Sequence, residues 1–274
     1  MSETALDPSA MPREIAPGVY WLGDCTKFAY EETVLHAYNS VFVVVGEEHS
    51  IVIESGITQD GPVLERQLDM LLSRGIPEPK YLFVTHSEIP HAGGIGRFLA
   101  RFPEAIACGG VGDLHLVFPQ YADRFRSLDP GDRLALGGRD FVVVEAVFRD
   151  LYYTRWGFDT GAKVLFAGDG FAYSHHHAAG QCGHLAEEVS ELNLPDHTAI
   201  FASAAFYWTQ FVDIEPYVAR LEELVFEELE AEVVAPTHGL PITDMRATMP
   251  LIVEGLRRGS QTVAGGSVFG ETVI

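Results

Sequence analysis

The chain has 274 residues, of which 47% are hydrophobic, and this is enough to bury a sizeable core in one domain. Its formal net charge is -21, from 39 acidic and 18 basic residues. That charge argues against nucleic acid and anionic membranes as partners, because both are bound through basic surfaces. The longest apolar stretch, residues 41–45, is too short to cross a bilayer.

The three cysteines, Cys25, Cys108 and Cys182, are odd in number and show no C-x-x-C spacing. A disulfide framework or a structural zinc knuckle is therefore not expected. The first residues lack the basic start and apolar run of a signal peptide. We expect a cytoplasmic protein with reduced thiols, in which residues 1–14 form a flexible tail and residues 15–274 form one domain.

The first half of the chain alternates predicted strands and helices. Four short apolar runs predict strands, at residues 19–23, 40–46, 50–55 and 80–85. Between the third and fourth runs, leucines recur at helical spacing from residue 64 to residue 72, and this helix ends at Gly75. A second helix begins after Gly93 and Gly94.

The second half repeats this plan. Three further runs predict strands, at residues 141–148, 162–168 and 232–236. Helices are expected over residues 213–231 and 244–258, and residues 170–184 are expected to be irregular. The first of these helices carries an acidic face, which we interpret as solvated surface. The element order predicts an α/β fold of two sheets packed face to face, with helices outside.

The most informative segment is residues 85–94, T-H-S-E-I-P-H-A-G-G, between a predicted strand and a predicted helix. Metal ligands suit this place because the strand fixes the backbone while a loop frees the side chains. His86 and His91 are five residues apart, so on a helix they would point about 140° away from each other. The helical H-E-x-x-H zinc motif is thereby excluded, and Pro90 disfavours a helix here. We expect a loop.

This segment resembles the metal loop of the metallo-β-lactamase superfamily, H-x-H-x-D-H, and above all the H-x-E-x-D-H form of its flavodiiron and oxygen-binding diiron branch. Other segments are similar in the same order: VYWLG, AYNSVFVVVG and IVIESG to the opening strands, VLFAGDGF to the strand before the bridging aspartate, and APTHG to the last histidine. The similarity spans residues 15–240. It implies an αββα sandwich, with two mixed sheets flanked by helices.

The resemblance also implies a metal centre with two ligand sets. These are His86, Glu88, Asp169 and Asp150 for one metal, and His91, His238 and the shared Asp169 for the other. The expected cofactor is one or two divalent metal ions, zinc or iron, with manganese as a further option, because imidazole and carboxylate suit these metals. Glu54 stands where the family has an aspartate, and it is expected to orient a ligand histidine through its other ring nitrogen.

Two positions depart from the family pattern. Pro90 stands where the family has an aspartate, and this weakens the second metal position. Asp150 stands where a mid-chain histidine is expected, and it either replaces that ligand or pairs on the surface with Arg149 or Arg155. A mononuclear site and a metal-free pseudo-enzyme therefore stay open. The histidines at 175–177 form either a solvated loop or a lid near the site, and we do not assign them as ligands.

Two classes of function follow. A hydrolase would use a metal-bound water, with Glu88 or Asp150 as the base and Glu54 as a weaker candidate. The alternative is a diiron protein that binds oxygen or nitric oxide. Flavodiiron enzymes need an attached flavodoxin domain, which we do not find in the sequence. We therefore expect a hydrolase with a small-molecule substrate, assembled as a homo- or hetero-oligomer.

The substrate is suggested only by aromatic residues around the proposed site. They indicate either ordinary core or a flat apolar pocket. These residues are Phe148, Tyr152, Tyr153, Trp156, Phe158, Phe171, Tyr173, Phe206, Tyr207 and Trp208. The fold that the resemblance implies includes hydrolases of activated aryl ethers, among them a dinitroanisole demethylase. An activated ester or ether is therefore the expected substrate, with a role in the degradation of aromatic compounds.

Overall fold

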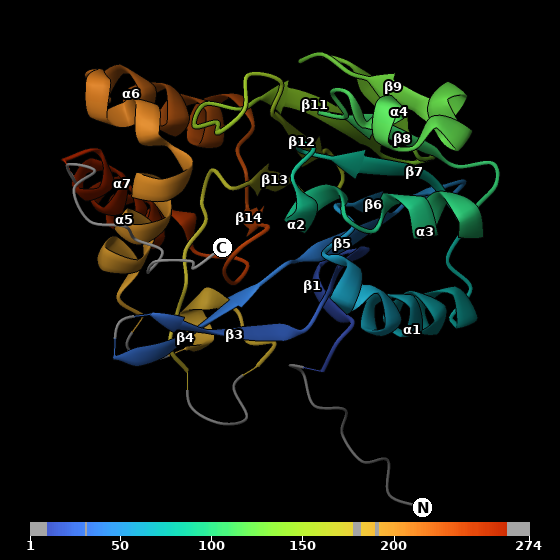
Figure 1. The fold of residues 1–274 in the computed structure, drawn as a ribbon, viewed down its shortest axis with the longest axis horizontal. Helices are drawn as coiled ribbons and strands as arrows, with labels where there is room; N and C mark the ends of the chain where they lie inside the picture. The colour runs from blue at the N-terminus through green and yellow to red at the C-terminus, as the bar shows by residue number, and fades with distance from the viewer. Residues whose placement is uncertain (1–9, 31, 178–181, 190–191, 262–274) are drawn as a thin grey trace, which may run out of the picture.

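Two β-sheets lie face to face in the computed structural model, and helices cover their outer faces (Figure 1). The structure describes residues 10–30, 32–177, 182–189 and 192–261. The expected αββα sandwich of two mixed sheets is confirmed. Residues 1–9 of the expected tail lie outside the described residues, and β1 begins at Arg13, inside the range that we expected to be tail.

The first sheet has seven strands in the order β1-β2-β5-β6-β7-β8-β9. Their bounds are Arg13–Ala16, Val19–Leu22, Val41–Val45, Ser50–Ile53, Pro79–Val84, Ile106–Gly109 and Phe125–Ser127. β5 and β6 are antiparallel, whereas β6, β7 and β8 run parallel. The parallel strands are buried on both faces, which explains their continuous apolar runs.

The second sheet has five strands in the order β10-β11-β12-β13-β14. Their bounds are Arg133–Ala135, Asp140–Glu145, Arg155–Asp159, Val164–Gly168 and Val233–Pro236. Only β13 and β14 pair in parallel. A separate hairpin, β3 (Cys25–Tyr30) with β4 (Thr33–Tyr38), projects from the body of the sandwich (Figure 1).

Aromatic side chains fill the space between the two sheets. The ring of Phe141 lies 4.9 Å from that of Phe83 and 5.8 Å from that of Phe166, centroid to centroid. Phe166 in turn lies 5.4 Å from Phe42. All four rings are almost completely buried. Burial of a side chain of this size contributes on the order of 2–3 kcal/mol to the stability of the fold. These ring contacts pack the two sheets against each other.

Helices on the two outer faces complete the layers. α1 (Gly61–Ser73) and α3 (Ile95–Arg101) cover the first sheet, and Leu64, Leu68 and Leu71 of α1 are buried as predicted. α5 (Leu194–Ala205), α6 (Glu215–Glu223) and α7 (Met245–Gln261) lie on the other side (Figure 1). Helix α4 (Leu114–Val117) is a single turn at the far edge of the first sheet.

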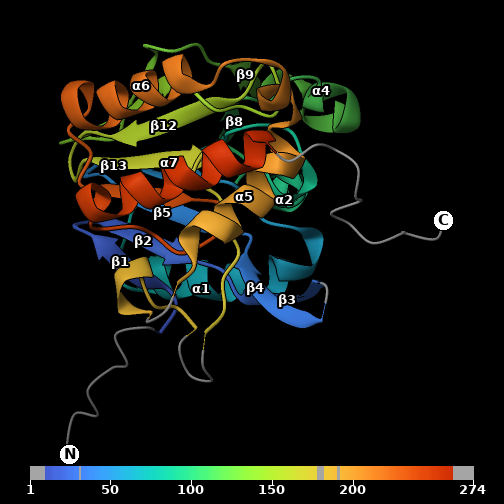
Figure 2. The ribbon, with the colours of Figure 1, turned by 90° about the vertical axis from the view of Figure 1, so that its left-hand side faces the viewer.

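Helices α5 and α7 pack closely along their length (Figure 2). Two glycines on α7 allow this approach. A Cβ on Gly255 would lie 2.5 Å from Cβ of Thr198, and a Cβ on Gly259 would lie 2.8 Å from Cβ of Ala202. Both distances are below van der Waals contact, so the spacing of the two helices depends on glycine at these two positions.

Several elements differ from the expectation. The helix predicted over 213–231 is α6 followed by a π-helical turn at Leu224–Glu228. The β3–β4 hairpin and α5 were not predicted, because the hairpin is mixed in polarity and α5 consists largely of small residues, which give weak periodicity. No helix among the described residues is long and apolar enough to cross a membrane.

Candidate metal centre

The candidate ligands lie where strands of both sheets end. His86 follows β7 of the first sheet, Asp169 follows β13 directly, and His238 follows β14. All three side chains are buried. Because β13 and β14 are parallel neighbours and the sheets pack face to face, these strand ends meet at one edge of the sandwich.

The segment between the two loop histidines contains a short helix, α2 (Ile89–Ala92). Our expectation of a loop throughout was wrong for these four residues. Pro90 is tolerated because it lies in the first turn, where a backbone N–H has no intrahelical partner. His86 lies before the helix, so the two histidines still do not share a helical face.

Three imidazoles surround the carboxylate of Asp169. Nε2 of His91 lies 3.4 Å and Nε2 of His238 lies 3.6 Å from its Oδ1. Nε2 of His86 lies 4.0 Å from Oδ2. Nε2 of His86, Nε2 of His91 and Oδ1 of Asp169 are buried without a hydrogen-bond partner among the described residues. Convergence of such atoms is unfavourable by itself and is the arrangement expected of ligands around a cation.

The Nδ1 atoms of His86 and His238, which do not face Asp169, have hydrogen-bond partners of their own. Nδ1 of His238 donates to the backbone carbonyl of Tyr38 at 2.7 Å. Thr85 donates its hydroxyl to Glu54 at 2.5 Å, so the same oxygen accepts from Nδ1 of His86 at 3.2 Å. With Nδ1 engaged in this way, Nε2 of each ring is turned toward a carboxylate. A cation placed between these nitrogens and carboxylates would be bound by both, and the residues therefore fit a divalent metal.

Glu54 holds His91 in this orientation. Its Oε1 lies 3.1 Å from Nδ1 of His91 and 3.3 Å from the hydroxyl of Thr237. Its backbone φ is 62°, in the left-handed region that is uncommon for residues other than glycine. A buried carboxylate that is fixed by several partners can keep such a conformation, and this strain is typical of functional sites.

The charges of the centre depend on one another. Burial raises the pKa of Asp169, but His91, His238 and His86 outweigh it and hold that pKa far below its usual range. Burial lowers the pKa of His91, but the carboxylates of Glu54 and Asp169 raise it well above its ordinary value. At His238 burial prevails and the pKa is lowered. An ionised Asp169 thus faces a neutral His238.

Asp150 lies in the centre and not in a surface pair. Its Oδ2 is 3.0 Å from Nε2 of His86, and its Oδ1 accepts from the hydroxyl of Thr154 at 2.9 Å. Burial raises the pKa of Asp150, but His86 lowers it, and the net pKa lies below the ordinary value. The two arginines that could have paired with it bind elsewhere: Arg149 contacts Glu145, and Arg155 contacts Asp129.

Glu88 forms the open side of the centre. Its Oε2 lies 3.9 Å from Nε2 of His86, and its side chain is 54% exposed, whereas the other candidate ligands are buried. Donor atoms of His86, Glu88 and Asp150 lie within 4.8 Å of one another, as do those of His86, His91 and Asp169. These two overlapping groups give a carboxylate-rich position beside an imidazole-rich one.

Sequence reasoning missed two groups that build this centre. The hydroxyl of Thr85 lies 3.2 Å from Nδ1 of both His86 and His91, and the Tyr38 carbonyl orients His238. Thr85 directly precedes His86, which is a signal that could have been used. The Tyr38 carbonyl leaves no signal in the sequence, because any residue offers a backbone oxygen.

The aromatic residues do not line a common pocket. Phe148, Trp156, Phe171, Tyr173 and Phe206 are among the most deeply buried side chains of the core, whose fully buried aromatics pack against neighbouring strands and helices. Tyr152 and Tyr207 are exposed at the surface. The alternative of ordinary core is therefore correct for most of them, and the proposed aromatic pocket is not supported.

The fold and the site together define a metal-binding αββα protein whose ligands come from both sheets. Residues 35–238 match the metallo-beta-lactamase superfamily, and the chain belongs to this superfamily. The expected cofactor, one or two divalent metal ions, is supported by this membership and by the convergence of donor atoms.

Two curated relatives indicate the branch. A coenzyme F420H(2) oxidase from Methanothermobacter thermautotrophicus is 28% identical over 246 residues, which are 84% of this chain and 57% of the relative. An anaerobic nitric oxide reductase flavorubredoxin from Salmonella arizonae is 24% identical over 215 residues, 74% of this chain and 41% of the relative. The chain thus spans about half the length of the curated relatives that it matches.

Solved structures show the same fold. The rubredoxin oxygen:oxidoreductase of Desulfovibrio gigas superposes with a TM-score of 0.71 at 14% identity, over 90% of this chain and 61% of that chain. The flavodiiron protein of Giardia intestinalis superposes with a TM-score of 0.68 at 19% identity, over 90% and 58%. The resemblance of the metal loop to the flavodiiron branch is confirmed.

These relatives overturn the expectation of hydrolysis. The matched curated relatives are named for oxidation and for nitric oxide reduction, and this contradicts the expected hydrolase. The expected ester or aryl-ether substrate and the role in aromatic degradation are not supported either. The base roles of Glu88 and Asp150 belonged to that reaction. Both residues stay in the site as candidate ligands.

Proposed function

We propose that this chain is an oxidoreductase domain that binds and reduces a small diatomic gas, dioxygen or nitric oxide, at an iron centre around Asp169. The observation that carries the proposal is the shared carboxylate: His91 and His238 face one oxygen of Asp169, while His86 faces the other. Asp169 would then be a ligand that is shared between the two metal positions. The names of the relatives support the reaction class.

The ligand set supports iron. The position around His86 has up to three carboxylates, those of Glu88, Asp150 and Asp169, together with one imidazole. Non-haem iron is typically bound by carboxylate oxygens and imidazole nitrogens that leave coordination positions open. Iron bound there would pass electrons from an external donor to the gas and would offer the gas an open coordination position.

The residues of the chain position this chemistry and keep it selective. Glu54 and Thr85 fix the rings of His91 and His86, and the Tyr38 carbonyl fixes His238. The histidines are buried and Glu88 is exposed, so a small molecule would approach the centre from the side of Glu88. The Glu88 carboxylate, which extends into solvent, is placed to carry protons inward, and reduction of dioxygen to water consumes protons and electrons in equal number.

The test uses the full chain loaded anaerobically with iron and reduced chemically with dithionite. We expect consumption of dioxygen or nitric oxide in excess of the protein concentration, measured with gas electrodes against the reductant alone. His91→Ala should lose at least about 90% of this turnover, and His115→Ala, on an exposed residue, should keep it. Absence of turnover with both gases in fully iron-loaded protein would contradict the proposal.

A further inference from the structure

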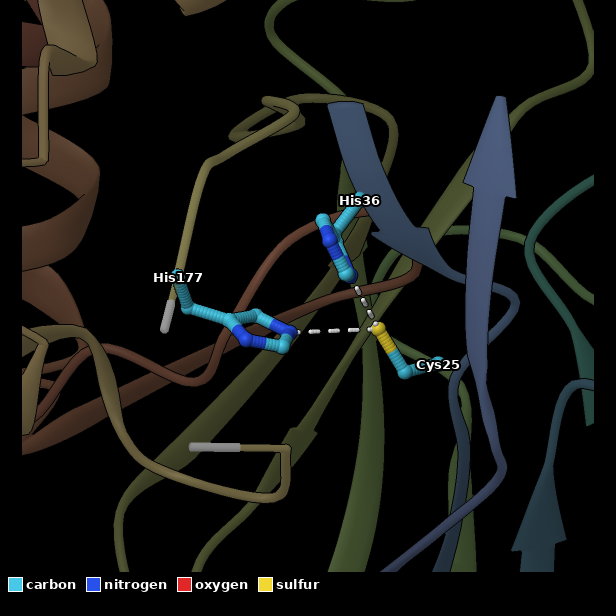
Figure 3. A group of neighbouring side chains, drawn as sticks. All are labelled: Cys25, His36 and His177. Atoms are coloured by element: carbon cyan, nitrogen blue, oxygen red, sulfur yellow. Dashed lines mark hydrogen bonds between the residues drawn. The ribbon is translucent and has the colours of Figure 1, made fainter. Parts of the chain in front are cut away.

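A second cluster of metal-binding side chains lies away from the Asp169 centre, between the β3–β4 hairpin and the segment that follows Tyr173 (Figure 3). Sγ of Cys25 lies 3.0 Å from Nδ1 of His36 and 3.3 Å from Nε2 of His177. These three donor atoms lie within 4.8 Å of one another. Sγ of Cys182 lies 3.6 Å from the same nitrogen of His177.

The distances between these atoms suit a tetrahedral metal ion. Zinc binds sulfur at about 2.3 Å and imidazole nitrogen at about 2.0–2.1 Å, so at tetrahedral angles sulfur and nitrogen ligands lie roughly 3.6 Å apart. Three of the four sulfur–nitrogen distances here run from 3.0 to 3.6 Å, and Cys182 would move toward the other three donor atoms to complete the set. A small outward movement of Cys25 would admit the ion. Two thiolates with two imidazoles form a common structural zinc set.

Backbone structure holds the ligands in place. In the β3–β4 hairpin, Lys27 is paired with His36, and Cys25 is paired with Tyr38. His36 also exchanges two backbone hydrogen bonds with His175, of 2.8 and 2.9 Å. This bridge fixes the segment that carries His177 against the hairpin, so ligands that are far apart in the sequence are brought together before any metal binds.

His175 is an independent sign that this region is built around a polar group. Its side chain is 1% exposed, and neither ring nitrogen has a hydrogen-bond partner among the described residues. Its ring centroid lies 5.2 Å from that of His177 and 6.0 Å from that of His36. A buried histidine without partners is costly in an ordinary core. Together with two further histidines and two cysteines, it forms a polar cluster whose nitrogen and sulfur atoms suit a cation.

A reactive cysteine is the competing interpretation of the cluster. Activated thiols have a lowered pKa and lie near positive charge. Here burial and the neighbouring Cys182 raise the pKa of Cys25 to about 12. This shift is in the direction opposite to activation.

We propose a second, structural zinc site in this protein, held by four side chains: Cys25, His36, His177 and Cys182. Binding releases the two thiol protons to solvent and involves no change of oxidation state. The ion ties the hairpin to the segment that carries His177. Because β4 also carries the Tyr38 carbonyl that accepts from His238, the zinc site secures one support of the Asp169 centre.

Cobalt(II) substitution in the full chain tests this site separately from the Asp169 centre. Thiolate-bound cobalt gives an intense sulfur-to-metal charge-transfer absorption in the near ultraviolet, and the nitrogen and oxygen ligands around Asp169 cannot give it. We expect this band to saturate at one equivalent in the wild type. It should disappear in Cys25→Ser and in His177→Ala, and the zinc content of each variant should fall by one equivalent.

Matched controls keep the result specific. Cys108→Ala removes the remaining cysteine, which is buried in the core, and His115→Ala removes an exposed histidine; both should keep the band. Circular dichroism checks that each variant is folded. If Cys25→Ser does not fold, the result for His177→Ala tests the zinc site. Absence of the band in the wild type, its persistence in both site variants, or a Cys25–Cys182 disulfide in anaerobically purified protein would overturn the proposal.

Discussion

Glu54 shows how a single residue supports the metal centre. It does not face Asp169, yet it fixes His91 and accepts from Thr85 while its own backbone is strained. We predict that Glu54→Gln, which keeps the shape and removes the charge, lowers metal affinity by about 10–100-fold. Competition with a chelator measures this in a Cys25→Ser background, so that only the Asp169 centre is titrated.

The control for this prediction is Glu65→Gln, which removes an exposed carboxylate paired with Arg97. It should leave metal affinity unchanged. Equal affinity of Glu54→Gln and the wild type would show that the ring of His91 is held without the carboxylate.

Pro90 is the second residue whose replacement is informative. The family places an aspartate here, and the second metal position now has only His91, His238 and the shared Asp169 as donors. We predict that Pro90→Asp raises affinity at this position by about tenfold, equivalent to roughly 1.4 kcal/mol. Metal analysis at limiting iron measures the gain. Pro90→Asn, with a similar shape and a weaker donor, should gain much less; similar gains in both variants would contradict ligation by the new carboxylate.

At the scale of elements, β1 is tied to the segment before α5. Arg13 donates two hydrogen bonds to the carboxylate of Glu188, at 2.7 and 2.8 Å, and a third to the carbonyl of Gly183. This ion pair lowers the pKa of Glu188 to about 2. Its contribution to stability is therefore complete above the ordinary pKa of about 4.5 and is lost as the pH falls toward 2.

We predict that the wild type loses about 1 kcal/mol more stability than Glu188→Gln between pH 5 and pH 2.5, where the value allows for the 41% exposure of the Glu188 side chain. Urea unfolding at a series of pH values measures the difference. Glu104→Gln, at an exposed position, should follow the wild type. Parallel pH profiles for the wild type and Glu188→Gln would mean that the pair contributes nothing.

The elements that could be predicted are those whose pattern of apolar residues shows which side chains are buried. β5 and β7 are continuous apolar runs, and α1 repeats leucine at helical spacing, so their positions followed from pattern alone. The loop motif with His86, Glu88 and His91 likewise pointed, through its family resemblance, to residues whose donor atoms the structure brings together. The β3–β4 hairpin could not be found, because its residues are ordered by pairing with distant segments such as His175. The cluster around Cys25 was missed for the same reason.

At the scale of the whole molecule, the Asp169 centre joins the two sheets. His86 and His91 follow the first sheet, whereas Asp169 and His238 follow the second. We predict that metal removal lowers the stability of the whole fold in one cooperative transition. Metal present at 100 times its Kd stabilises the fold by about 2.7 kcal/mol, so its removal lowers the free energy of unfolding by this amount and lowers Tm by roughly 5–10 °C.

Differential scanning calorimetry with and without a chelator measures this shift. The same experiment on His91→Ala should show a smaller difference between the two conditions, because the site then binds metal weakly. Two separate transitions, of which only one responds to the chelator, would show that the sheets unfold independently and that the metal belongs to one of them.

The close packing of α5 and α7 has a consequence for selectivity. Phe201 of α5 lies against His238, with ring centroids 5.1 Å apart, and the depth of α5 is set by the absence of side chains at Gly255 and Gly259. A methyl group added on α7 therefore displaces an aromatic wall of the centre without touching a ligand. The space beside the metal ligands can therefore be adjusted from the outer layer of the protein, at positions where variation leaves the ligand chemistry intact.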